Sequence, residues 1–143
     1  MYLAIVLDEE SQEFLRGQVD APAYEVLGHH TTICMGSDSK GKYPFTVGEG
    51  VTCIIDAIGI TTVGDLPAKD RKKLSPDLDD CQVVSICMRV VLPDGKFVKN
   101  GSPHVTCAVD RNIGGKPMHS NHSNWKETVH KGRELKGVVT LCE

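Results

Sequence analysis

The chain has 143 residues, of which 40% are hydrophobic and 24% are charged, and its net charge at pH 7 is −3. These proportions are ordinary for a globular protein and argue against a disordered, fibrous or collagen-like chain. The negative charge argues against non-specific binding to a long nucleic-acid backbone but leaves room for a local pocket that binds a small anion. No apolar run approaches the ~20 residues that a membrane helix needs, and no secretory signal is visible. We therefore expect a single cytoplasmic domain over residues 1–143.

The six cysteines form no C-x-x-C pair. Most of them lie in runs of β-branched residues, as Cys87 does in VVSICMRVV and Cys107 in HVTCAVD. Free cysteine in such a run behaves as a small buried hydrophobe. Because no export signal is visible, we predict that all six are reduced core residues of an intracellular protein. A structural zinc site needs closely spaced ligand pairs, which the sequence lacks, so we expect neither a metal nor another cofactor.

The predicted elements begin with a strand over residues 2–7, which are apolar and β-branched. Asp8 is placed to cap a short helix that follows, with acidic residues near the positive end of the helix. The next strand ends at Gly36, and a loop rich in glycine and serine comes after it. A long strand, with a break near Gly59, covers residues 51–63.

The second half of the chain predicts three further strands and one helix. Residues 81–92 have the strongest strand pattern, and the Pro-Asp-Gly turn at 93–95, which leads into residues 96–98, predicts a hairpin. Residues 101–110, entered through a Gly-Ser-Pro turn, and residues 137–143 predict the other strands, and residues 126–135 predict a short helix. The expected fold class is α+β, with mostly antiparallel sheets and two to three helices. No internal repeat is found, and no linker is long enough to separate domains.

Two of the predicted strands share the pattern His-x-Thr-hydrophobic, at His30–Ile33 and at His104–Cys107. Alternate residues of a strand share a face, so each histidine lies on the same face as its own threonine. By the same alternation Cys34 and Ala108 continue this polar face, while Met35 lies on the opposite face, toward a core. The two motifs therefore predict a matched pair of polar strand faces.

The alternation also distinguishes His30 from its neighbour His29. A motif that began at His29 would place Ile33 and Met35 on the polar face, so His30 is the better candidate. A single His-x-Thr triplet is common by chance. The evidence for a functional pair comes from the repetition of the triplet on two distant strands with the same alternation. The alternative interpretation is two ordinary strand histidines, each satisfied by a neighbouring hydroxyl group.

With HTTI at 30–33 and HVTC at 104–107, the chain resembles the 2H phosphoesterases. That superfamily includes LigT-like RNA cyclic phosphodiesterases and the cyclic phosphodiesterase domains of tRNA ligases. The resemblance covers the whole chain in element order and is specific at the two motifs. It implies a bilobal, pseudo-symmetric domain in which each lobe contributes one His-x-Thr strand to a central groove. The chain is shorter than typical cellular members, which implies trimmed peripheral elements.

The four motif residues can supply what cleavage of a phosphodiester needs. One proton must leave the attacking oxygen and one must reach the leaving oxygen. His30 and His104 can act as this base and acid, because imidazole has an ordinary pKa near 6.5. Thr32 and Thr106 place hydroxyl donors beside them, where each can hold a nonbridging phosphate oxygen. No metal is required, and either histidine can be the base, because the roles exchange with the direction of the reaction.

Weaker candidates lie in the loops. In 2H phosphoesterases the loop after the second motif commonly borders the groove, which implies phosphate or ribose contacts from Lys116, Ser120 and Asn121. A simple surface turn is the alternative. Tyr43 and Trp125 are candidates for stacking on a base, although a lone aromatic side chain more often packs in a core or an interface.

The leading hypothesis is a metal-independent phosphodiesterase acting where a ribose 2′-oxygen takes part. Its substrate would be either a 2′,3′-cyclic phosphate at an RNA end or a small cyclic or 2′–5′-linked oligonucleotide messenger. Compact 2H enzymes, including viral ones that disarm immune signalling, degrade such messengers. The alternative from another class is a noncatalytic nucleotide- or RNA-binding module with the same groove. We expect a small nucleotide or RNA-end partner, and neither a membrane nor a long nucleic-acid duplex.

Overall fold

The computed structural model describes residues 1–19, 24–36, 42–99 and 101–143. Its main elements, in chain order, are β1 (Tyr2–Leu7), α1 (Glu9–Arg16), β2 (Glu25–Val26), β3 (His30–Met35), β4 (Gly50–Thr62), α2 (Ala68–Arg71), β5 (Val83–Val91), β6 (His104–Val109), β7 (Asn124–Lys126) and β8 (Glu134–Cys142). Short 3-10 helices occupy Val63–Asp65, Pro93–Gly95, Arg111–Ile113 and Pro117–His122. The helices in these described ranges are all too short or too polar to cross a bilayer.

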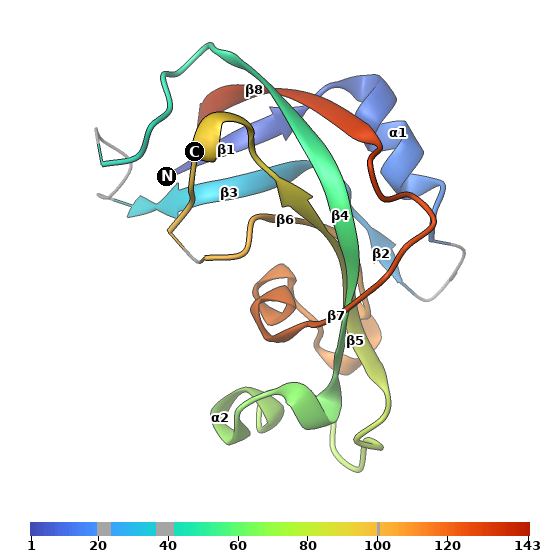
Figure 1. Cartoon of the computed structure of the whole chain (residues 1–143). Helices are drawn as coiled ribbons and strands as arrows, with labels where there is room; N and C mark the ends of the chain where they lie inside the picture. Colours follow the sequence, from blue (N-terminus) through green and yellow to red (C-terminus); the bar gives the residue numbers. More distant parts are fainter. Residues whose placement is uncertain (20–23, 37–41, 100) are drawn as a thin grey trace.

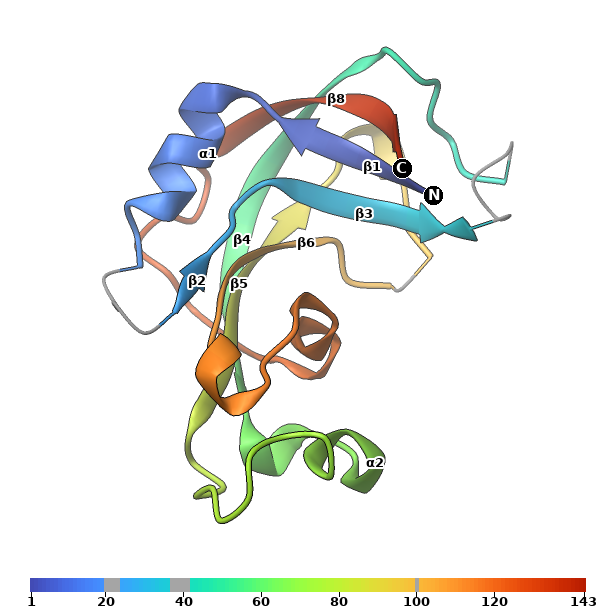
Figure 2. The same ribbon diagram turned by 180° about the vertical axis from the view of Figure 1, so that it is seen from behind.

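The described strands pair antiparallel in one continuous eight-stranded sheet. Its order is β2-β6-β3-β1-β8-β4-β5, and β7 pairs with β4. Since β6 also pairs with β5, the strands β1, β3, β6, β5, β4 and β8 close into a ring (Figures 1 and 2). An α+β fold dominated by antiparallel strands is thereby confirmed. All the pairing among the described strands runs through this one sheet, and the bilobal arrangement stays a prediction.

One cluster of buried apolar side chains draws on all six strands of the ring. Ile5 on β1, Ile33 on β3 and Val105 on β6 are each at most 1% exposed. The helix α1 adds Leu15 to the cluster, and Asp8 caps this helix as predicted by accepting a hydrogen bond from a backbone N–H of its first turn. This core holds β3 and β6, which carry the two motifs, side by side in the sheet.

The strand β4 runs through Gly59 without the predicted break. A β-carbon at this position would lie 2.5 Å from the ring of Trp125, so close packing of this ring, and not a break, requires glycine there. The hairpin predicted at the Pro-Asp-Gly turn is wrong, because Pro93–Gly95 forms a 3-10 helix and residues 96–98 form no strand. The strand β5 pairs antiparallel with β6 instead, which begins farther along the chain.

The helix predicted over residues 126–135 is wrong. Gly132 has a φ of 92°, which a helix does not allow, and Val129 is 96% exposed, whereas Leu135 is buried as part of β8. Turns precede β8 instead. All six cysteines are free and four are buried as predicted, but Cys81 is exposed and Cys142 is only partly buried.

A β-bulge follows the first motif and reverses the side-chain alternation beyond it. Consecutive residues of β1 pair with Thr32 and with Cys34, so Ile33 is an extra residue in β3. The prediction that Cys34 shares the polar face is therefore wrong, because Cys34 is buried in the core. Met35, which was expected to face the core, is 56% exposed.

The second motif has the same local plan. Consecutive residues of β5 pair with Thr106 and with Ala108, which makes Cys107 the extra residue in β6. Ala108 was expected on the polar face and is fully buried instead. Both bulges thus fall on the residue directly after the motif threonine, and alternation from the histidine holds only up to that threonine.

Thr31, the middle residue of the first motif, has a buried hydroxyl group without a hydrogen-bond partner, and no other buried side chain in the described ranges shares this property. The second motif has Val105 at the equivalent position. An unsatisfied buried hydroxyl group costs about 1–3 kcal/mol. We therefore expect Thr31→Val to raise the free energy of unfolding by about 1 kcal/mol, as measured by denaturant titration.

Thr61→Val is the matched control for this substitution. Thr61 is equally buried, but its hydroxyl group donates to the His119 carbonyl oxygen at 3.1 Å and lies 2.9 Å from Ser123 Oγ. Its replacement removes hydrogen bonds and is expected to lower the free energy of unfolding. Equal destabilisation by the two valine variants would show that the Thr31 hydroxyl group is not a liability.

Candidate functional site

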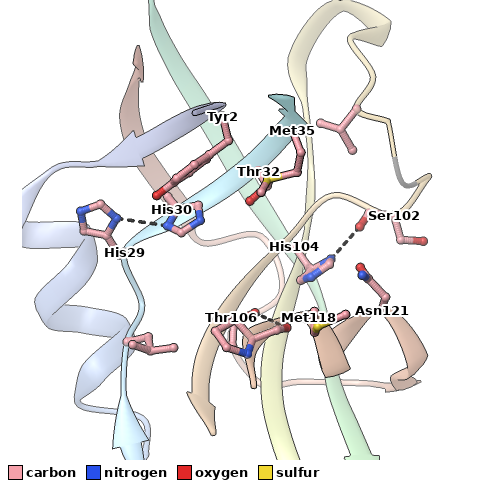
Figure 3. A pocket seen from close by; sticks show the side chains of 13 residues that line it. Tyr2, His29, His30, Thr32, Met35, Ser102, His104, Thr106, Met118 and Asn121 are labelled. Carbon is pink, nitrogen blue, oxygen red and sulfur yellow. Dashed lines mark hydrogen bonds between the residues drawn. The ribbon is translucent and has the colours of Figure 1, made fainter. Parts of the chain in front are cut away.

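A cavity of about 640 Å³ opens between β1, β3, β6 and the 3-10 helix Pro117–His122 (Figure 3). The motif residues His30, Thr32, His104 and Thr106 all line it. The rest of its wall is mostly apolar and includes Leu27, Met35, Val98, Pro117 and Met118. The structure thus brings together in one cavity the four residues that the sequence singles out for chemistry.

The register between β3 and β6 determines how the motifs face each other. Thr31 pairs with Val105, so the central residues of the two motifs lie opposite one another. Because the strands are antiparallel, the two motifs run in opposite directions from this pair (Figure 3). The two imidazoles therefore reach the cavity from different strands.

His104 is held by a backbone carbonyl group. Its Nδ1 lies 2.9 Å from the carbonyl oxygen of Ser102, and because a carbonyl oxygen only accepts, this nitrogen carries the proton. The neutral ring then has its lone pair on Nε2. Burial lowers the pKa of His104, and the Ser102 carbonyl group partly opposes this effect by stabilising the imidazolium.

His30 contacts two other rings. Its Nδ1 lies 3.1 Å from the Nδ1 of His29, and the ring of Tyr2 lies 5.3 Å from its own, centre to centre. Burial above all, and then the neighbouring His29 and His104, lower the pKa of His30 to about 4. The other motif histidine is thus one of the groups that disfavour a positive charge on His30.

Both motif histidines are thus neutral in the free protein at pH 7. An anion between them would raise both pKa values, because an opposite charge within about 4–6 Å favours the imidazolium. A bound phosphate group can therefore supply the condition under which one ring stays a base and the other becomes an acid.

Thr106 belongs to a chain of hydroxyl groups that leads into the protein. Its Oγ1 donates to Ser120 Oγ at 3.1 Å, and Ser120 Oγ donates to Ser85 Oγ at 3.2 Å. The Pro117 carbonyl oxygen, at 3.4 Å, is a second acceptor for Thr106. Ser120 is fully buried and does not line the cavity. The structure therefore places Ser120 behind Thr106, where it can act on a ligand only through that side chain.

The other predicted contacts fall into two groups. Asn121 lines the cavity, whereas Lys116, Tyr43 and Trp125 do not. Lys116 is exposed to solvent, and Tyr43 packs against the main hydrophobic core. The guanidinium of Arg89 lies 5.1 Å from the centre of the Trp125 ring. The two aromatic candidates for base stacking thus pack against the protein's own side chains.

Two residues that hold the motif histidines, His29 and Ser102, were not predicted from the sequence. On β6, Val105 pairs with Thr31, and the next residue, Thr106, accepts a hydrogen bond from the backbone N–H of Gly28. His29 and His30 are therefore both extra residues relative to β6, and both reach the cavity. Strand alternation cannot reveal this, although two adjacent histidines at the start of a motif are a usable signal. Ser102 acts through its carbonyl group, which every residue type has.

No Lys, Arg, Asp or Glu is found among the described residues that line the cavity. Within the described ranges, no three His, Cys, Asp or Glu side chains converge in a way that could hold a metal ion. A scan against protein-family models found no match to the chain, and searches of curated proteins and of solved structures found none either. Function is therefore inferred from the cavity and the side chains around it.

Proposed function

We propose that the protein is a metal-independent phosphodiesterase that cleaves a nucleotide phosphodiester in which a ribose 2′-oxygen takes part. The observation that carries the proposal is that two His-x-Thr motifs, far apart in the sequence, line one cavity. In this proposal the chain is a 2H-like phosphoesterase whose two motif strands correspond to the two lobes of that fold. The paired motif centres and the matching bulges support this correspondence.

The hydrogen bonds of the two histidines favour different roles. His104 is the acid, because the Ser102 carbonyl oxygen stabilises its protonated ring. His30 is the base and takes a proton from water as the water oxygen bonds to phosphorus. His104 gives its proton to the ribose oxygen as the bond between that oxygen and phosphorus breaks. Thr32 and Thr106 donate hydrogen bonds to the nonbridging oxygens, on which charge develops.

The apolar part of the cavity suits the rest of a nucleotide. Met35 and Met118 are 56% and 59% exposed, and with Tyr2 they offer a surface against which a ribose or a base can pack. The low charge of the described wall suits a single phosphodiester anion. Both substrate classes, the 2′,3′-cyclic phosphate and the small cyclic or 2′–5′-linked oligonucleotide, meet these conditions. We place the reaction in the cytoplasm of the producing or host cell.

A substrate panel in EDTA tests the proposal. The protein is incubated with 2′,3′-cyclic AMP, with 3′,3′-cyclic GMP-AMP and with a 2′–5′-linked adenylate dinucleotide, and the products are separated by chromatography. We expect at least one compound to be hydrolysed despite the chelator, because two histidines supply both proton transfers.

Each outcome of the panel has a distinct meaning. Hydrolysis of the cyclic mononucleotide alone favours an RNA-end substrate, and hydrolysis of either dinucleotide favours a messenger. Binding without turnover of any compound would favour the noncatalytic module. Activity that is abolished by EDTA and restored by a divalent ion would contradict the metal-independent mechanism.

A further inference from the structure

His29 contacts the proposed base but has no part in the mechanism above. Its ring lies edge-on to that of His30, with centres 5.3 Å apart and planes at 77°, and the two Nδ1 atoms are 3.1 Å apart (Figure 3). At this distance one Nδ1 carries a proton and the other accepts it, because two N–H groups or two lone pairs would repel each other. The contact therefore links the tautomers of the two rings.

We propose that His29 is a positioning residue for His30: its Nδ1 accepts the Nδ1 proton of His30, which keeps the lone pair of His30 on Nε2. This inference rests on the proposed role of His30 as the base. It gives His30 the same kind of support that His104 receives from the Ser102 carbonyl group. Both motif histidines would then have a protonated Nδ1 and a free Nε2 in the neutral state.

The surroundings of the two rings favour this direction of the hydrogen bond. His29 is exposed, so solvent water can accept from its Nε2–H group. Figure 3 shows the second ring nitrogen of His30 pointing away from His29, on the side of the cavity. In the reverse tautomer that nitrogen would carry the proton, and His30 could not accept a proton from a bound water molecule there.

The groups that act on His30 come from β1 and β6 as well as from His29. Tyr2 on β1 packs against His30 with the ring planes tilted by 42°, and His104 on β6 lowers the pKa of His30. His29 is in direct contact with His30 through the two Nδ1 atoms, and it also contributes to the lowered pKa of His30.

Nitrogen-15 NMR of the histidine rings tests the contact without any substrate. In the wild-type protein above pH 7, we expect the neutral ring of His30 to carry its proton on Nδ1. In His29→Ala this preference is lost, and in His29→Asn it is kept, because the amide oxygen of asparagine can accept the same proton. An unchanged His30 tautomer in His29→Ala would overturn the inference.

Kinetics with the substrate found by the panel give a second measurement. We expect His29→Ala to lower kcat by about 10–100-fold, with KM changed by less than about twofold, and His29→Asn to restore most of the loss. The rescue by His29→Asn is a readout that a merely structural role of His29 would not give. An equal loss of kcat in both variants would also overturn the inference.

The two tests separate this inference from the proposed function. If no phosphodiester is hydrolysed, the proposed function fails, but the NMR measurement still decides whether His29 sets the tautomer of His30. If hydrolysis is found and the His30 tautomer is independent of His29, the proposed function stands and the inference fails.

Discussion

Replacing His30 or His104 with alanine is expected to lower kcat by about 10²–10⁴-fold and to leave KM nearly unchanged. Each substitution removes one of the two groups that transfer a proton in the transition state, while ground-state binding by the hydroxyl groups and the apolar wall persists. Because both histidines serve the same step, the double variant is expected to be little slower than the slower single variant. Steady-state kinetics on the substrate found by the panel measure these effects.

His130→Ala is the matched control for both histidine variants. His130 packs against Phe14, with ring centres 5.1 Å apart, and does not line the cavity. Its replacement is expected to keep normal turnover. Thermal melting of every variant accompanies the assays and identifies any that unfold. Near-normal turnover by a folded His30→Ala or His104→Ala protein would show that this histidine has only a structural role and would contradict the two-histidine mechanism.

The pH profile of the wild-type protein is expected to reflect the lowered pKa values of His30 and His104. The value of kcat/KM reports the free protein, in which the base must be neutral and the acid protonated. His30, with a pKa of about 4, is neutral above that pH, and His104 loses its proton below its usual value of 6.5. A bell-shaped profile with its maximum on the acid side of pH 6.5 is therefore expected. The maximum of kcat is expected at higher pH, because the bound phosphate raises both pKa values.

The sequence predicted the parts of the site that depend on short-range pattern. Strand periodicity located both motifs on strands, and alternation within each motif correctly paired each histidine with its threonine on the cavity wall. Asp8 at the start of α1 was predicted for the same kind of reason, since a cap depends on residues three positions apart. These features need no knowledge of the partner strand.

The features that failed depend on residues that are distant in the sequence. The bulge that moves Cys34 into the core exists only relative to the register of β1. The glycine at position 59 is required by the ring of Trp125, which β7 brings against β4. Ser120 follows the second motif in the sequence, where a contact with the groove was expected. Its hydrogen bonds to Thr106 on β6 and Ser85 on β5 instead hold it buried behind Thr106. The positions of these three residues depend on contacts between segments that are distant in the sequence, and no local sequence pattern predicts those contacts.

The hydroxyl groups of the two motifs are expected to matter almost as much as the histidines. Thr32→Val and Thr106→Val each keep the β-branched shape of the side chain and remove one donor to a nonbridging phosphate oxygen. Removing one such donor costs up to about 2–4 kcal/mol in the transition state, which corresponds to roughly 30–10³-fold in kcat/KM. Unlike the histidine variants, these variants are expected to show losses in both KM and kcat, because the donor contacts the bound ground state as well.

Serine variants at the same positions separate the hydroxyl group from the shape of the side chain. Thr32→Ser and Thr106→Ser keep the donor and are expected to retain most of the activity. Ser120→Ala is expected to have a smaller effect than Thr106→Val. The Ser120 hydroxyl group only accepts a hydrogen bond from Thr106 and donates its own to Ser85 Oγ. Thr106 must turn its proton from Ser120 or the Pro117 carbonyl group toward the phosphate, so removing one competing acceptor leaves that donor intact. If Ser120→Ala proved as damaging as Thr106→Val while the protein stayed folded, the proton of Thr106 would not be the group that holds the phosphate.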